Sequence, residues 1–379
     1  MRVAPHRVVI AGGGVAGLEA LVALHGLAGD RVDITLVSPN RRFGLRADAV
    51  DAAFGGPAPA QHDVAMIADD HGAHLLRDAL HVVHREYATA LTESGRELQY
   101  DSLLVAVGAH AHPHPALRDA LTFWGMADVP AVSALLADID AGRARSVMFV
   151  VPPGATWTLP AYELALLCAQ YAIDRSLDVT VTIATPEPAP VSALGPQAGD
   201  AIAASLAAAG VRLRARLPVQ RLEGDRLLDL RGHVLASADR VVALPLLVGP
   251  RLRGLPHDRD GFIPVDATGA IRGVPSAYGA GDGTTVPFKQ GGLAAQQAEV
   301  AAHAIARASG ADVAATTMDP TLRAHAAAGT GATWFSTPLR ASSGRAPVLS
   351  ESPLWHPSTK VSMPYLASYL QRVDARIAE

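Results

Sequence analysis

The chain has 379 residues, too long for one nucleotide-binding unit and suited to two such units with a tail. Hydrophobic residues make up 49% of it, enough for large cores. The formal net charge is −4 without a basic run, which argues against nucleic acid as a partner. The longest stretch without a charged residue, Ser146–Tyr162, contains Pro152, Pro153 and Pro160, so it is not a membrane-spanning helix. The first residues lack the apolar run of a secretory signal, and we expect a cytoplasmic protein.

The stretch Arg7–Gly17, RVVIAGGGVAG, begins as a short buried strand and ends in a glycine-rich turn, and a helical run, Leu18–Leu27, follows at once. This order of strand, turn and helix is typical of dinucleotide binding. Gly12 allows the tight turn, Gly14 lets a pyrophosphate approach the backbone, and Gly17 lets helix and strand pack closely. The helix N-terminus offers free N–H groups to the phosphates.

A second parallel strand is expected over Asp33–Val37. An acid usually ends this strand and binds the adenosine ribose, but here Ser38 takes that place, and a hydroxyl is a weaker acceptor than a carboxylate. The residues Ala73–Tyr100 predict a β-meander with turns near Asp78 and Ser94-Gly95. The chain then returns to the parallel sheet over Tyr100–Gly108.

A second Rossmann-like unit follows the first. Its first turn contains Pro152-Pro153 and Trp157 with one glycine, and its second strand ends at Thr185-Pro186 without an acid or arginine placed for a ribose. Two prolines remove N–H donors, so a nucleotide site here is expected to be lost or much altered. The expected elements are strands over Ser146–Val151, Asp178–Ala184, Val211–Arg216 and Asp239–Pro245, helices over Leu159–Ile173 and Gln197–Ala209, and a hairpin region over Val219–Ala238.

Two later stretches complete the pattern: Tyr100–Ala109, YDSLLVAVGA, and Tyr278–Asp282, YGAGD, which is followed by Phe288–Glu299, FKQGGLAAQQAE. With the glycine-rich turn, in this order, they resemble the FAD-binding half of the pyridine nucleotide-disulfide oxidoreductases. The resemblance implies an α/β fold of two Rossmann-like, three-layer ββα domains and a C-terminal cap. The expected boundaries are 1–115 with 246–315 for the FAD-binding domain, 116–245 for the second domain, and 316–379 for the cap.

The segment Ala161–Ala165, AYELA, resembles the part of sulfide:quinone oxidoreductases, flavocytochrome c sulfide dehydrogenases and type II NADH dehydrogenases that places a glutamate beside the flavin. The resemblance implies that Glu163 carries a proton near flavin N5, that Asp282 holds the ribityl chain, and that Lys289 lies near N1 and the C2 carbonyl. It assigns contacts with FAD to Gly12, Gly14, Val15, Ala16, Gly17, Ser38, Pro39, Arg46, Leu80, Ala106, Gly108, Ala109, Gly281, Asp282, Lys289 and Gly291.

Cysteine and lysine are both scarce. The only cysteine, Cys168, lies in a helical run and is expected to be a core residue, so the redox cysteine pair of disulfide reductases cannot form within this chain. Lys289 and Lys360 are the only lysines, which suggests that a compact ammonium is required at these positions. No metal site is expected at the alternating histidines that follow Ala109, because no cysteine or carboxylate stands at ligand spacing.

Three functional hypotheses are open at this point. The first is an FAD oxidoreductase that passes electrons from a small-molecule donor to a quinone-like acceptor. The second is an NAD(P)H-dependent flavoprotein reductase with an altered nucleotide site, and the third is a flavoprotein without turnover, acting as a sensor or scaffold. The amphipathic run Tyr365–Ile377 is expected either to meet a membrane surface or to dock as an ordinary helix, and a homodimer is left open.

Overall fold

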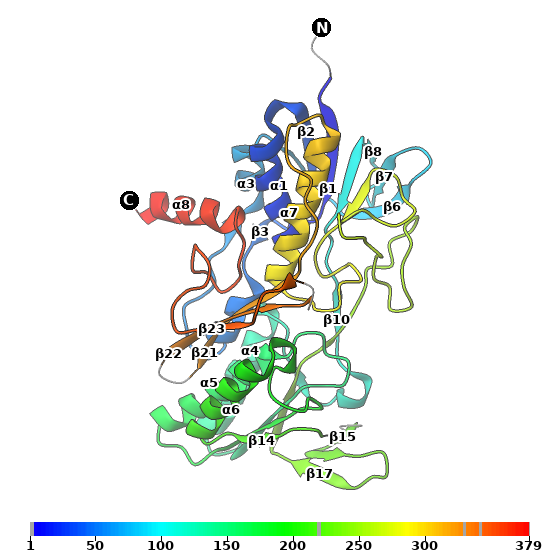
Figure 1. The fold of residues 1–379 in the computed structure, drawn as a ribbon. Coiled ribbons are helices and arrows are strands. Elements are labelled where there is room, and N and C mark those ends of the chain that lie inside the picture. The colour runs from blue at the N-terminus through cyan, green and yellow to red at the C-terminus, as the bar shows by residue number, and fades with distance from the viewer. Residues whose placement is uncertain (1–3, 218–220, 329–330, 341–342, 379) are drawn as a thin grey trace.

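The computed structural model describes residues 4–217, 221–328, 331–340 and 343–378. The fold is mixed α/β, as predicted, with two parallel sheets that belong to two Rossmann-like units. In Figure 1 the first unit, in blue and gold, stands above the second, in green. The first two residues of the expected hairpin region, Val219 and Gln220, lie outside the described residues.

The first sheet is parallel throughout, and its strand order is β20-β9-β1-β2-β5. Alternate residues of β1 point to opposite faces: Val8 and Ile10 pack with the helices α1 and α7, which lie side by side, and Val9 packs on the other face. The bounds are β1 His6–Ala11, β2 Val32–Val37, β5 His74–Leu76, β9 Ser102–Val105, β20 Ala277–Gly279, α1 Val15–Ala28 and α7 Gly291–Ala308.

A small antiparallel sheet covers the other face, which completes three layers. Its strands are β6 Leu80–His84, β7 Thr89–Thr92 and β8 Glu97–Gln99. The prediction of one meander from Ala73 to Tyr100 was wrong at its start. The segment β5 pairs in parallel with β2, because α3, Val64–Asp70, returns the chain to the edge of the first sheet.

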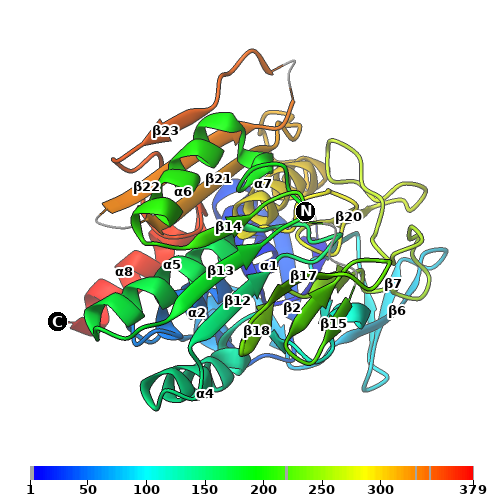
Figure 2. The same ribbon diagram turned by 90° about the horizontal axis from the view of Figure 1, so that it is seen from below.

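The second sheet has the order β11-β18-β12-β13-β14 and is also parallel. Figure 2 shows it from below, with α5 and α6 over one face and β15 to β17 beyond the other. Neither β11 nor α4 had been expected from the sequence. The bounds are β11 Leu121–Thr122, β12 Ser146–Val150, β13 Thr180–Ala184, β14 Arg212–Arg214, β18 Arg240–Ala243, α4 Val129–Asp140, α5 Leu159–Asp174, α6 Pro196–Ala208, β15 Arg221–Glu223, β16 Arg226–Leu228 and β17 Val234–Ser237.

Short elements join the two units and frame the site. The two crossings between the units pair with each other as β10, His110–His112, and β19, Leu246–Val248. After β2 come β3, Arg42–Phe43, α2, Ala49–Ala52, and β4, His62–Asp63.

The tail forms a sheet and a helix. Strands β21, Thr321–Ala328, and β22, Gly331–Pro338, make a hairpin that contacts both α5 and α7, and β23, Val348–Ser350, extends it. In Figure 1 this orange hairpin lies between the two units. The hairpin had not been predicted, although the buried residues Leu322, Ala324 and Ala326 of β21 alternate with polar ones.

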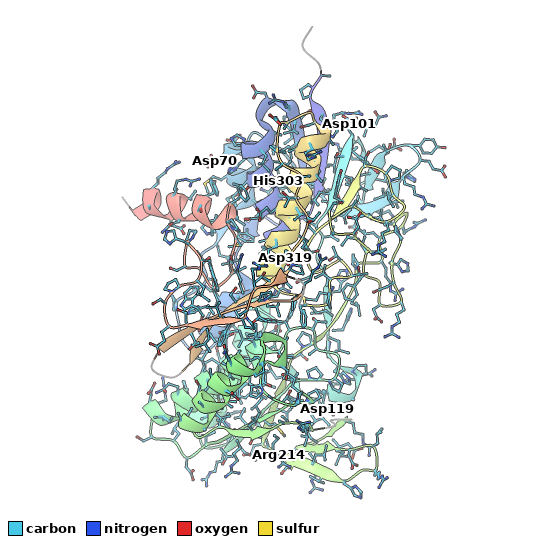
Figure 3. The ribbon with its side chains drawn as sticks, viewed as in Figure 1. Asp70, Asp101, Asp119, Arg214, His303 and Asp319 are labelled. Carbon is cyan, nitrogen blue, oxygen red and sulfur yellow. The ribbon has the colours of Figure 1, made fainter. Side chains whose placement is uncertain are left out.

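Helix α8, Leu366–Ala378, ends the chain, and its apolar face packs against α1 and the neighbouring core. Leu366, Leu370 and Val373 are at most 7% exposed, so this face is used inside the protein, as in the docked alternative. The hydroxyl of Tyr369 donates to Asp70, labelled in Figure 3, at 2.7 Å. Among the described helices, none combines the length and apolarity needed to cross a membrane.

A buried carboxylate fastens α8. Glu19 of α1 is fully buried and accepts hydrogen bonds from the backbone N–H groups of Tyr365 and Leu366, at 3.0 and 2.7 Å. These N–H groups belong to the start of α8, where a helix has no internal acceptors for them. Burial raises the pKa of Glu19 to about 7, against the two backbone hydrogen bonds, which lower it. No motif in the sequence marks this contact.

We predict that Glu19→Gln reduces the dependence of stability on pH. The folded state keeps a proton on Glu19 that the unfolded chain has released, so the free energy of unfolding should fall as pH rises from about 4.5 to about 7. The glutamine variant should lose this pH-dependent contribution, about 3 kcal/mol between pH 5 and 8, because the amide does not titrate. Urea unfolding of both apoproteins at pH 5 and 8 tests this, and an equal pH dependence in the two proteins would contradict it.

Candidate functional site

A cavity of about 670 Å³ opens at the carboxyl ends of β1 and β9, where dinucleotides bind in folds of this type. It runs from the glycine-rich turn to the loop between β5 and β6. Most of the residues expected to contact FAD line it: Gly12, Gly14, Val15, Ala16, Pro39, Arg46, Leu80, Ala106, Gly108, Ala109, Gly281, Asp282 and Gly291. Gly17 and Ser38 do not line it, and Lys289 lines a neighbouring cavity instead.

The glycines of the turn have separate tasks. Gly12 has a φ of 120°, and a Cβ there would lie 2.2 Å from the carbonyl oxygen of Ala106. A Cβ on Gly17 would lie 1.8 Å from the carbonyl oxygen of Gly12, so this glycine is required for packing. A Cβ on Gly14 would meet no atom within 4 Å and would project into open space. Gly14 therefore leaves room for a ligand, and the turn fits a dinucleotide.

The adenosine end of the cleft differs from the expectation. Ser38 is fully buried beneath the turn, and its hydroxyl accepts a hydrogen bond from the N–H of Asn40 at 3.2 Å. A Cβ on Gly13 would lie 2.4 Å from the Ser38 Oγ, so the hydroxyl lies directly against the backbone of the glycine turn. Asn40 and Glu93 line this part of the cleft instead. Neither residue stands at a position that the dinucleotide motif marks.

A smaller cavity of about 130 Å³ adjoins the cleft and shares Val15, Arg46, Asp282 and Gly291 with it. Apolar and aromatic side chains form most of its wall, including Phe123, Trp124, Trp157, Leu159 and Leu244. Its ionisable residues include Glu163, Lys289, Lys360 and His325. Both lysines of the chain thus meet at one cavity, although they lie 71 positions apart.

Arg46 lines both cavities. Its guanidinium lies 3.8 Å above the ring of Trp124 and pairs with Asp282 at 3.1 Å. Asp282, the expected partner of the ribityl chain, has a side chain that is 12% exposed. The arginine therefore holds this carboxylate at the junction of the cleft and the smaller cavity, and the stacking on Trp124 fixes the direction of the guanidinium.

Glu163 is the buried member of an ion group. The ammonium of Lys360 lies 3.2 Å from its Oε1 and 2.9 Å from Asp51 Oδ2. The Glu163 side chain is 6% exposed, and its Oε1 makes the ion pair without hydrogen-bond geometry. Burial raises the pKa of Glu163 to about 7, although Lys360 lowers it. Burial alone would lower the pKa of Lys360, but Glu163 and Asp51 together raise it. Glu163 can thus exchange a proton near neutral pH while Lys360 stays charged.

Lys289 is also buried, at 5% exposure. Its ammonium donates to the backbone carbonyls of Thr284 and Val286, and it lies 3.9 Å above the ring of Phe262. Burial lowers the pKa of Lys289 to about 8, although Asp282 and Asp258 raise it. Its placement beside the flavin ring stays a prediction.

Cys168 is a core residue of α5. It is fully buried and lines neither cavity, and burial raises the pKa of its thiol to about 12. A thiol is a nucleophile only as the thiolate, so this one is unreactive at neutral pH.

Gly14→Ala and Gly17→Ala form a matched pair of tests for the FAD site that the sequence resemblance implies. Gly14→Ala should leave the melting temperature of the apoprotein unchanged and weaken FAD binding by about tenfold or more, because the methyl group enters the cleft. Gly17→Ala should destabilise the apoprotein itself by about 1–3 kcal/mol, because its methyl group overlaps Gly12. Thermal unfolding and FAD titration measure both. Unchanged FAD affinity in Gly14→Ala would contradict this placement.

Cys168→Ala should keep the protein's redox chemistry. Since the thiol is buried away from both cavities, we expect a loss of about 1–2 kcal/mol in the free energy of unfolding and unchanged rates of flavin reduction and reoxidation. Stopped-flow absorbance with a chemical reductant tests this. Loss of flavin reduction in the folded variant would indicate a thiol mechanism.

Residues 6–308 match the family model described as pyridine nucleotide-disulphide oxidoreductase. No curated protein sequence matches the chain. The solved structures that resemble it include the sulfide:quinone oxidoreductase of the hyperthermophilic bacterium Aquifex aeolicus, with a TM-score of 0.81 and 20% identity over 91% of this chain and 86% of that one.

Two electron-transfer reductases are similar as well. Putidaredoxin reductase, in its covalent complex with putidaredoxin, has a TM-score of 0.67 and 18% identity over 88% of this chain and 82% of that one. A ferredoxin reductase from Rhodopseudomonas palustris has a TM-score of 0.64 and 18% identity over 87% and 82%. At these identities the structures show a common fold. The family model spans most of the chain, and the chain therefore belongs to the pyridine nucleotide-disulphide oxidoreductase family and is an FAD-dependent oxidoreductase.

Proposed function

We propose that this oxidoreductase passes electrons through non-covalent FAD to a quinone-like acceptor in the smaller cavity, and that it does so without a cysteine pair. The observation that carries the proposal is the cavity itself: an aromatic and apolar wall beside the cofactor cleft, with a carboxyl group and an ammonium group on its lining. A quinone is a flat apolar ring whose two oxygens gain electrons and protons together, so it needs these two kinds of group.

The residues have distinct tasks in this proposal. Trp124 and Trp157 provide apolar surface for a planar ring. Lys360 stabilises the negative charge that develops on an acceptor oxygen, because it stays charged in a buried place. Glu163, with a pKa of about 7, holds the proton that this oxygen takes up. Reduced FAD, when bound, would supply the electron pair together with the second proton that the quinone takes up.

The comparisons support this class of acceptor. The sulfide:quinone oxidoreductase of Aquifex aeolicus has the same fold over 91% of this chain. The single buried cysteine does not support the use of a thiol pair. The electron donor is proposed to be a small-molecule reductant. NADH, NADPH and sulfide are the donors to compare in an anaerobic reduction panel, and a reduced ferredoxin is the protein donor that would contradict this choice.

Glu163→Gln tests the proton donor. Holoprotein with photochemically reduced flavin is mixed anaerobically with menadione, and the rate of flavin reoxidation is followed from pH 5.5 to 8.5. In the parent the rate should fall as pH rises through about 7, because the carboxyl group donates only while protonated. In the variant the rate should be lower by about 10²–10⁴ and should lose this pH dependence.

Ferricyanide provides the control, because it accepts electrons without protons. It should reoxidise the flavin of the parent and of Glu163→Gln at the same rate, which separates proton donation from damage to the site. The proposal fails if menadione does not reoxidise the parent, or if Glu163→Gln reacts with menadione as the parent does.

A further inference from the structure

The second Rossmann-like unit has an acid just beyond the carboxyl end of β13 that the sequence pattern did not reveal. Glu187 follows β13 by three residues, beyond the Thr185-Pro186 pair at which we expected no acid. In dinucleotide-binding folds an acid near the end of the second strand binds a ribose hydroxyl. Here the carboxylate turns inward to the first turn of the unit and to α5.

Both oxygens of this carboxylate are fully used. Oε1 accepts from the hydroxyl of Thr158 at 3.2 Å and from the backbone N–H of Ser192 at 2.9 Å. Oε2 accepts from the hydroxyl of Tyr162 at 2.7 Å and from that of Thr185 at 3.2 Å. Two donors for each oxygen satisfy the acceptor capacity of a carboxylate, and Tyr162 and Thr185 are fully buried.

The backbone around this carboxylate is also adapted to it. Val191 has a φ of 44°, a left-handed conformation that is strained for a β-branched residue. The next residue, Ser192, donates its N–H to the carboxylate. The position of that donor therefore depends on an unfavourable conformation, which the hydrogen bond helps to compensate.

We infer that Glu187 is an internal anion that takes the place of a bound dinucleotide in the second unit. A phosphate beside Glu187 would meet a carboxylate that already occupies the surrounding donors, and Pro152 and Pro153 in the neighbouring turn have no N–H to offer. NAD(P)H is thereby excluded. By binding Thr158, Glu187 also fixes the turn whose Thr156 and Trp157 line the smaller cavity. The second unit then serves as a wall of the site rather than as a nucleotide site, whatever the electron acceptor is.

Chemical rescue tests this inference on the holoprotein. Glu187→Ala should lower the melting temperature by about 5 °C or more, because four donors lose their acceptor. Millimolar acetate or phosphate, compared with chloride at equal ionic strength, should restore part of this loss in a saturable manner, because the donors then bind an external anion. The parent should not respond to these anions, and millimolar NADH or NADPH should neither raise its melting temperature nor bleach its flavin.

Glu86→Ala is the matched control. Glu86 is an exposed glutamate after β6, so its removal changes the net charge equally but should neither destabilise the protein nor create a response to anions. If Glu187→Ala does not fold, Glu187→Gln replaces it in the test. Its amide occupies the space of the carboxylate, so a smaller fall in melting temperature and no rescue by anions are expected.

The inference is overturned if the parent binds NADH or NADPH, if Glu187→Ala is as stable as the parent, or if acetate and phosphate do not stabilise a destabilised Glu187→Ala. None of these measurements involves a quinone, so the inference and the proposed acceptor can fail separately.

Discussion

The structure depends on one buried ammonium between two carboxylates. Lys360 comes from the tail, Asp51 from the first unit and Glu163 from the second, so a single ion group joins three parts of the chain. Removing such charges from water is costly, and the loss of one partner would leave the others uncompensated. If the tail detached, Asp51 and Glu163 would therefore lose the cation that they share. The same group raises Lys360's pKa and places a titratable carboxyl at the cavity.

This arrangement shows how a two-unit flavoprotein fold is used without its usual thiols. The first unit keeps the glycine turn and the cleft that fit FAD. The second unit keeps the parallel sheet and its helices, but Glu187 binds the donors beyond the end of β13, and the first turn contributes Trp157 to the cavity. Fold and chemistry are thus separable: the scaffold is common to reductases of several kinds, and the site decides the reaction.

Much of the fold could be predicted from the sequence because its signals are local. The strand, glycine turn and helix at the start of the chain occupy neighbouring positions, and each glycine acts through its own backbone. The parallel strands of both sheets appear as short apolar runs, since both faces of each sheet are covered. Composition alone marked Cys168 as solitary and drew attention to Lys289 and Lys360, which both line one cavity.

The rest was decided by tertiary contacts that no local pattern encodes. Asp51 and Lys360 are 309 positions apart, and Glu19 meets the start of α8 across 346 positions. The direction of the side chain also decided the roles of two residues near strand ends. Ser38 points beneath the glycine turn, and Glu187 points into its own unit. Sequence by itself therefore determined the two Rossmann-like units, the dinucleotide cleft and the absence of a cysteine pair within the chain. Only the tertiary structure decided which charges are paired, because pairing depends on distances between segments that the order of residues does not specify.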